Sequence, residues 1–355
     1  MSKLIIAAAG SGKTETLVNM ALSEKGPVLI TTYTDNNVDE VKSRFYEKRG
    51  CIPQNVVVLP WYTFMLTYGV KPYQDLKFKN DIRGVCITGG GSAKYIKKGK
   101  KEFYFTDDNA IYADKIAQLL LDLNEEIDGH VIANIRTLFP VIYIDEVQDL
   151  TGYDQELIQS LIDGGIDVTC VGDPRQGVFI TCKGNKNRKY FRSKMMDFFS
   201  TRLPLLEVDQ ESLKTNYRCV GDICQLSDQL FPEFTHVVSG NHQKSKRNGC
   251  YFVRPSDIEE YQLECPAMQL RHSIRSKVNE KYLTNNFGLV KGKTFSHVLI
   301  YPTEPMINWL IHKREIESPE TKAKLYVAIT RARYSVGFVY DYPDSFSHDL
   351  IKLYK

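Results

Sequence analysis

The chain has 355 residues, of which 43% are hydrophobic and 25% charged, and its formal net charge is +3. This length leaves room for about two domains that each bury their own core, and the composition is that of a soluble globular protein. The small net charge excludes a uniformly basic surface, so any basic region must be local.

The N-terminus, MSKLIIAAAG, has the lysine, apolar run and small residues of a short signal peptide. The apolar run is too short for one and continues directly into GSGKT, so we interpret it as a buried first strand. No later segment is long and apolar enough to span a membrane. The eight cysteines form neither a CxxC pair nor a Cys/His ligand spacing. We therefore expect a cytoplasmic protein with reduced thiols and no membrane partner.

Short β-branched, apolar runs bounded by turn residues recur in the first half of the chain. They are predicted to be buried parallel strands, because strands covered on both faces lose the polar–apolar alternation. These runs are residues 4–7, 28–32, 56–59, 141–144 and 168–171. Helical patterns lie between several of them, including residues 15–23 and 109–123. Strands that alternate with helices predict a doubly wound α/β sheet.

A second set of strand patterns predicts a second α/β unit. Its strands are residues 251–253, 298–301 and 335–340, and its helices include residues 319–329. We predict a first domain at residues 1–205, with a modest insertion around residues 65–135, and a second domain at residues 206–355. Two stretches are locally basic, residues 89–105 (GGGSAKYIKKGKKEFYF) and 183–194 (KGNKNRKYFRSK).

Residues 7–16 (AAAGSGKTET) fit the phosphate-loop pattern, with Ala7 in place of the usual first glycine. Two glycines let the backbone N–H groups turn toward phosphate oxygens, and the following helix adds the positive end of its dipole. Lys13 is expected to neutralise the β- and γ-phosphates, and the Thr14 hydroxyl to take one Mg²⁺ position. The expected nucleotide contacts are Ala9, Gly10, Ser11, Gly12, Lys13, Thr14 and Glu15. A glycine turn before a helix is the poorer alternative, and the pattern alone predicts an NTPase.

The strand at residues 141–144 runs into Asp145 and Glu146. It delivers them to the carboxyl edge of the sheet, where open α/β sheets bind their ligands. Asp145 is expected to hold Mg²⁺, and Glu146 to orient and deprotonate the attacking water. A strand ending in a solvated acidic turn is the alternative, and the preceding phosphate loop weakens it.

Further motifs stand in a fixed order along nearly the whole chain. They are residues 31–37 (TTYTDNN), 61–64 (WYTF), 145–149 (DEVQD), 171–179 (VGDPRQGVF), 213–218 (LKTNYR), 291–295 (KGKTF) and 325–333 (LYVAITRAR). In this order the chain resembles superfamily 1 helicases of the UvrD/Rep type. The resemblance implies a P-loop NTPase with two tandem RecA-like parallel-sheet domains. It also implies ATP and Mg²⁺ as cofactors and single-stranded nucleic acid, DNA in preference to RNA, as the track.

The resemblance implies roles for residues within these motifs. Gln176 is implied to sense the γ-phosphate. Arg218 and Arg331 are implied to act as arginine fingers, since guanidinium groups stabilise the negative charge of the transition state. For the arginines, surface salt bridges are the alternative. Tyr217 is implied to stack on adenine, and Gly292 to lie among the nucleotide contacts.

The resemblance also implies where a single strand would bind. The implied contacts are Tyr33, Thr34, Thr63, Phe64 and Phe179. Aromatic rings hold a strand by stacking without reading its sequence, and core packing is the alternative for each of them. The two basic stretches are candidates for contacts to phosphates, with a solvated lysine-rich loop as the alternative.

The chain departs from the family in ways that predict a minimal motor. Only six residues precede Ala7, which leaves no space for the upstream glutamine motif that grips adenine. Thr181 stands where family members have a tryptophan, Thr294 replaces the acidic residue of KGLEF, and Gly288 replaces a histidine. The spacing from Arg218 to the KGKTF motif leaves essentially no room for a second-domain insertion.

The leading interpretation is therefore an ATP-dependent single-stranded nucleic-acid translocase or helicase, hydrolysing MgATP between two RecA-like lobes. One alternative is a regulatory ATPase whose nucleotide state gates a partner such as a nuclease. Since the chain shows no nuclease motif of its own, cleavage would require that partner. The other alternative is a viral-type RNA helicase, because KGKTF is similar to motifs of viral superfamily 1 enzymes that act on RNA.

Overall fold

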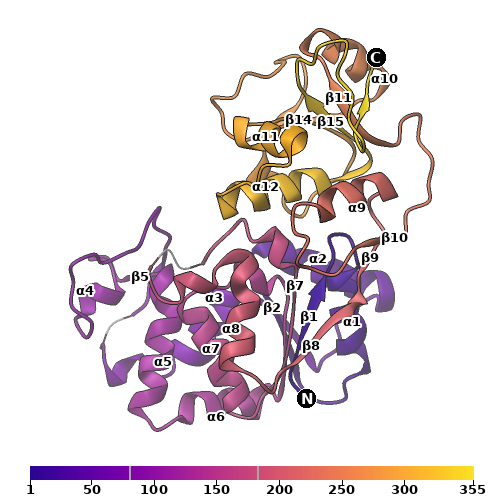
Figure 1. Ribbon diagram of the computed structural model, residues 1–355. Coiled ribbons are helices and arrows are strands. Elements are labelled where there is room, and N and C mark those ends of the chain that lie inside the picture. The colour runs from indigo at the N-terminus through magenta and orange to yellow at the C-terminus, as the bar shows by residue number, and fades with distance from the viewer. Residues whose placement is uncertain (80, 182–183) are drawn as a thin grey trace. The chain divides into compact units, whose positions relative to one another are not determined.

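The computed structural model describes residues 1–79, 81–181 and 184–355 (Figure 1). Outside this description lie Asn80, Cys182 and Lys183, which include one of the eight cysteines and the first residue of the basic stretch 183–194. The chain divides into two compact units. The first unit is Met1–Ile5, Lys13–Pro174 and Phe179–Asp209, and the second is Ile6–Gly12, Arg175–Val178 and Gln210–Lys355.

The first six-stranded sheet has the strand order β3-β2-β6-β7-β1-β8. Its strands are β1 (Lys3–Ala7), β2 (Val28–Thr32), β3 (Val56–Pro60), β6 (Val141–Ile144), β7 (Asp167–Gly172) and β8 (Glu207–Leu213). Strand β2 runs parallel to β3 and β6, and β6 runs parallel to β7. Every residue of β2 is buried, as its continuous apolar run predicts. The carboxyl ends of these four parallel strands share one edge of the sheet.

Helices accompany this sheet (Figure 1). They are α1 (Lys13–Ser23), α2 (Asp35–Arg49), α3 (Trp61–Phe64), the π-helix η1 (Met65–Val70), α5 (Ile116–Glu126), α6 (His130–Leu138), α7 (Tyr153–Asp163) and α8 (Met195–Arg202). Helix α2 begins after Thr34, whose side chain accepts the N–H of Asn37, and ends at Gly50 in the left-handed conformation. Within the described residues, no helix has the length and apolar character needed to cross a bilayer.

The predicted insertion contains a short parallel pair, β4 (Gly84–Cys86) and β5 (Ala110–Tyr112), and the one-turn helix α4 (Lys101–Tyr104). The helix predicted over residues 109–123 is therefore wrong at its start. Asn109 has a left-handed φ of 63°, and the Ala-Ile-Tyr run after it pairs with β4. A 3-10 turn, η3 (Ala113–Lys115), follows, and the regular helix α5 begins only at Ile116.

The second six-stranded sheet has the order β13-β12-β14-β15-β11-β16, and all its neighbouring strands are parallel. Its strands are β11 (Gly249–Val253), β12 (Met268–Arg271), β13 (Thr284–Asn286), β14 (Phe295–Tyr301), β15 (Ala332–Val339) and β16 (Lys352–Leu353). Its helices are α9 (Gly221–Asp228), α10 (Ile258–Glu264), α11 (Glu304–His312) and α12 (Pro319–Thr330). A separate pair joins β9 (Thr215–Asn216) to β10 (Val238–Ser239).

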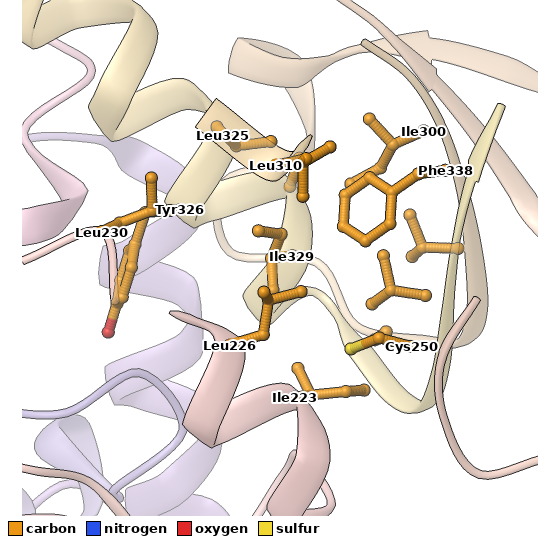
Figure 2. Close-up of a cluster of buried hydrophobic side chains, with 14 of the residues drawn as sticks. Ile223, Leu226, Leu230, Cys250, Ile300, Leu310, Leu325, Tyr326, Ile329 and Phe338 are labelled. Carbon is orange, nitrogen blue, oxygen red and sulfur yellow. The ribbon is translucent and has the colours of Figure 1, made fainter. Parts of the chain in front are cut away.

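Apolar side chains fill both faces of the second sheet. Figure 2 shows Ile223 and Leu226 of α9, Leu310 of α11, Ile329 of α12 and Phe338 of β15 in one buried cluster. A second cluster places Ile258 and Tyr261 of α10 against Val253 and Leu299. Helices cover both faces of the second sheet. The protein is an α/β protein, as predicted, and its two six-stranded sheets are consistent with tandem RecA-like domains.

Candidate active site

The phosphate loop connects β1 to α1. Gly10 and Gly12 have φ values of 68° and 84°, in the left-handed region that favours glycine. Between them the Ser11 side chain is buried, and its Oγ has no hydrogen-bond partner among the described residues. Buried polar atoms in proteins are nearly always satisfied. A phosphate oxygen would satisfy this hydroxyl, so the loop fits the ligand that its sequence predicts.

Four predicted site residues lie together in the first unit. The Thr14 Oγ1 donates a hydrogen bond to Asp145 Oδ2 at 3.1 Å. The Lys13 Nζ lies 3.8 Å from Glu146 Oε1. The backbone N–H of Asp145 donates to the carbonyl of Thr31 at 2.9 Å, which extends the pairing of β6 with β2 by one residue. The sheet itself therefore fixes the position of the acidic pair.

Asp145 is almost completely buried. Burial and the neighbouring Glu146 carboxylate raise the pKa of Asp145, while Lys13 and the Thr14 hydroxyl act in the opposite direction. A divalent cation would stabilise the charged carboxylate. The oxygen donors of Thr14 and Asp145 are of the kind that Mg²⁺ prefers, so the residues present fit this ion.

The backbone of Glu146 is in the left-handed conformation, with φ 55° and ψ 40°, which is uncommon for a residue with a side chain. Its carboxylate accepts a hydrogen bond from Gln148 Nε2. The other amide atom of this buried residue, Gln148 Oε1, accepts the backbone N–H of Asp173 at 3.0 Å. Gln148 thus ties the DEVQD turn to the GDPRQ turn, a function that the sequence interpretation did not assign to it.

A glycine at the end of β7 leaves space for Gln148. A Cβ atom on Gly172 would lie 2.3 Å from Gln148 Oε1 and 2.9 Å from the Val147 side chain. We expect Gly172→Ala to lower the free energy of unfolding by about 1–3 kcal/mol, in the range of overpacking. Urea denaturation measures this effect. Gly26→Ala is the matched control, because its Cβ would meet nothing within 4 Å. Equal unfolding midpoints for the two variants would contradict the expectation.

A second cluster lies in the second unit. Arg331 follows α12, is 2% exposed, and donates from Nη2 to Gln176 Oε1 at 3.0 Å. Its Nη1 donates to the carbonyl of Lys293 at 3.3 Å, within the KGKTF motif. The Nη1 of Arg218 donates to the carbonyl of Thr330 at 3.2 Å. The three residues implied to sense or stabilise the γ-phosphate thus gather near one end of α12.

The loop residues 6–12 belong to this second unit. The N–H of Tyr217 donates to the carbonyl of Gly10 at 3.0 Å. A Cβ on Gly10 would lie 2.7 Å from both Asn216 Oδ1 and the Arg218 side chain. Asn216 Oδ1 also accepts the N–H of Arg218 at 2.8 Å, so Asn216, which the sequence interpretation left without a role, shapes this turn. Tyr217 is 67% exposed, which leaves its ring available for stacking.

The remaining predicted nucleotide contacts differ in their surroundings. The methyl group of Ala9 is buried in the core of the second unit, so only its backbone is available to a ligand. Glu15 forms an ion pair with Lys48 of α2. Gly292 has a left-handed φ of 85°, and a Cβ there would meet nothing within 4 Å.

The predicted nucleic-acid contacts lie in the first unit, after β2 and β3 and at residue 179. The half-buried Tyr33 meets Tyr62 edge-on, with 5.6 Å between ring centroids. Thr34 caps α2, and Thr63 is exposed. Phe179 is 37% exposed, so part of its ring faces solvent.

Phe64 differs from these residues. Its side chain is 0% exposed and packs against Trp61 and Tyr68. The structure therefore corrects the expected stacking contact at Phe64 in favour of core packing. Thr181, at the position where the resemblance led us to expect a tryptophan, is also buried and accepts the N–H of Thr151 at 2.9 Å.

Both basic stretches expose lysines. In the first, Lys94, Lys97, Lys98, Lys100 and Lys101 are all exposed. Lys98 is anchored to Asp122 of α5 at 2.7 Å, and the ring of Tyr95 is completely exposed. In the described part of the second stretch, Lys186 pairs with Glu156 of α7 at 3.3 Å.

Comparison with known proteins bears directly on this site. Residues 92–185, which contain both the DEVQD and the GDPRQ motifs, match the UvrD/REP helicase N-terminal domain. Over these residues the resemblance to helicases of the UvrD/Rep type is confirmed. Among curated proteins, none matches the chain in sequence.

This chain is similar to solved viral helicases. Arterivirus nonstructural protein 10 (helicase) is 14% identical with a TM-score of 0.51, covering 97% of this chain and 60% of that one. Its complex with DNA gives 14% identity and a TM-score of 0.48, with coverages of 96% and 60%. The PRRSV helicase is 15% identical with a TM-score of 0.44, covering 97% of this chain and 53% of that one. The chain thus spans about 60% of the length of the first of these helicases, and the first comparison supports the fold alone.

Proposed function

We propose that this chain is a superfamily 1 translocase or helicase that hydrolyses MgATP and moves along single-stranded nucleic acid. The observation that carries the proposal is the cluster in the first unit. There Lys13 lies 3.8 Å from Glu146, and Thr14 bonds Asp145 at 3.1 Å, directly after the phosphate loop. The UvrD/REP match over residues 92–185 supports the same function.

In this proposal each group has a defined task. Ser11 and Lys13 bind the β- and γ-phosphate oxygens, and Thr14 and Asp145 hold Mg²⁺, which neutralises phosphate charge when it is bound. Glu146 accepts the proton of a water whose oxygen bonds to the γ-phosphorus, as the bond to the β–γ bridging oxygen breaks to give ADP and phosphate. Arg218 and Arg331 stabilise the charge that develops on the transferred group.

The track is proposed to be a single strand, bound through Tyr33, Thr63 and Phe179. Partly exposed aromatic rings suit stacking on bases, and the exposed lysines of residues 94–101 suit the phosphates. DNA is the preferred track. RNA is the second candidate because of the viral-type KGKTF motif, and a regulatory ATPase that gates a nuclease or another partner protein is the third.

We expect ATP hydrolysis to be stimulated by single-stranded DNA, and the stimulation to fall steeply as salt rises. Phe179→Ala should weaken binding of the strand by about 1–3 kcal/mol, the typical contribution of one stacked base. Fluorescence anisotropy with a labelled oligonucleotide measures binding, and phosphate release measures turnover. Tyr46→Ala, which removes an exposed ring from α2, is the matched control and should change neither.

The three candidates give different results in this experiment. Stronger stimulation of ATP hydrolysis by RNA than by DNA would favour a viral-type RNA helicase. A rate of ATP hydrolysis that neither DNA nor RNA changes would reject a translocase and favour the regulatory ATPase.

A further inference from the structure

A short segment after β7, residues 175–178, belongs to the second unit, whereas its neighbours Pro174 and Phe179 belong to the first. The segment lies along one face of α12. Val178 packs on Ala323 and Val327, and Gln176 bonds Arg331 at 3.0 Å. Because these α12 positions are four residues apart, they lie on the same side of the helix.

Arg175, the first residue of this segment, is buried, with 3% of its surface exposed. Its guanidinium lies 5.2 Å from the ring centroid of Tyr326 and 5.7 Å from that of Phe234. Its Nη1 lies 3.9 Å from Asp228 Oδ1, at the end of α9. Arginine seldom lies inside a protein without a paired charge. Arg175 lies beside two aromatic rings and a carboxylate.

Asp228 is held in place from its other side. Its Oδ2 accepts the N–H of Val237 at 2.8 Å and lies 3.6 Å from the imidazole of His236. Burial raises the pKa of the Asp228 carboxyl, and the Val237 N–H and the Arg175 guanidinium oppose that shift. Arg175, the Asp228 carboxylate and the rings of Phe234 and Tyr326 therefore form an anchor for the segment.

The geometry points to Arg175 as a positioning residue, which fastens residues 175–178 to α9 and α12 and thereby holds Gln176 in contact with Arg331. This inference rests on the proposed function, in which Gln176 and Arg331 respond to the γ-phosphate. Arg175 acts through its neighbour and does not touch the nucleotide. Without the anchor, the Gln176–Arg331 bond would form in only a fraction of the molecules, and turnover would fall with that fraction.

The test is a double-mutant cycle between Arg175→Ala and Gln176→Ala, read in nucleic-acid-stimulated turnover. We expect Arg175→Ala to lower kcat about tenfold, the size of coupling found between residues in one network, with little change in KM for ATP. In the Gln176→Ala background the same substitution should have no further effect on kcat. Two independent, multiplicative losses would overturn the inference, because they would mean that Arg175 does not act through Gln176.

A second readout does not depend on activity. Hydrogen exchange of the amides in residues 175–178 should be faster in Arg175→Ala than in the wild type, and unchanged in Arg314→Ala, a control at an exposed arginine of the same unit. Unchanged exchange in Arg175→Ala would reject the anchor. If Arg175→Ala does not fold, Asp228→Asn, which keeps the shape but removes the charge, takes its place in both measurements.

The two readouts also separate this inference from the proposed function. A wild-type chain without nucleic-acid-stimulated turnover would reject the proposed function. The exchange experiment would still decide whether Arg175 fastens the segment.

Discussion

Replacing Glu146 with glutamine is expected to abolish ATP turnover while leaving binding of MgATP nearly unchanged. An amide cannot accept the proton of the attacking water, and general bases contribute about 10²–10⁴-fold to rate. The substitution preserves size, and the side-chain oxygen can still accept the hydrogen bond that Gln148 donates. The substitution leaves Thr14 and Asp145, the residues that would hold the metal ion, unchanged.

Single-turnover hydrolysis and equilibrium binding of a fluorescent ATP analogue separate the two effects. Lys13→Ala supplies the opposite pattern, because removing the phosphate countercharge should weaken nucleotide binding itself. Glu47→Gln, at an exposed carboxylate of α2, is the matched control and should behave as the wild type. If Glu146→Gln hydrolyses ATP at the wild-type rate, Glu146 is not the base.

Arg331→Ala is expected to lower kcat by about a thousandfold or more, the usual effect of removing an arginine finger, with a much smaller change in ATP affinity. Two contributions reinforce each other. The guanidinium would stabilise transition-state charge, and in the second unit the same group holds Gln176 at 3.0 Å. Arg331→Lys should recover little activity, because an ammonium cannot reproduce the forked contact to Gln176 and Lys293.

The same motif contains a matched control. Arg333 lies two residues further along the chain and is exposed, so Arg333→Ala should leave turnover unchanged. Steady-state kinetics with an unfolding curve for each variant distinguishes lost chemistry from lost structure. Point variants test the assignment better than a chain that ends near Gln210. Residues 6–12 pack with the second unit, so the shortened chain would also lose the contacts that hold the phosphate loop. Wild-type turnover in Arg331→Ala would remove the finger assignment.

The parallel strands were the most predictable part of the fold. The predicted strands at residues 28–32 and 141–144 match Val28–Thr32 and Val141–Ile144 at both ends. Both are central strands, so burial on two faces makes their sequences continuously apolar. Strands with polar sequences lack this apolar pattern. Strand β8 reads EVDQESL and β13 reads TNN, and neither was predicted.

The candidate site was predictable where a motif follows a strand. Lys13, Thr14, Asp145 and Glu146 lie together because two strands of one sheet end at the same edge. Contacts that depend on tertiary packing left no such signal. Nothing near Arg175 in the sequence indicates Asp228 as its partner. The sequence could not decide between base stacking and core packing for Phe64. Only its packing against Trp61 shows that it lies in the core.

The left-handed backbone of Glu146 has a consequence for protein engineering. Such a conformation costs a residue with a side chain about 1–3 kcal/mol, whereas glycine adopts it without that penalty. A library screened only for thermal resistance would therefore be expected to enrich Glu146→Gly, and every molecule so selected would have lost its proposed base. Selection for activity has to accompany selection for heat tolerance at this position, because the two act on the same residue in opposite directions.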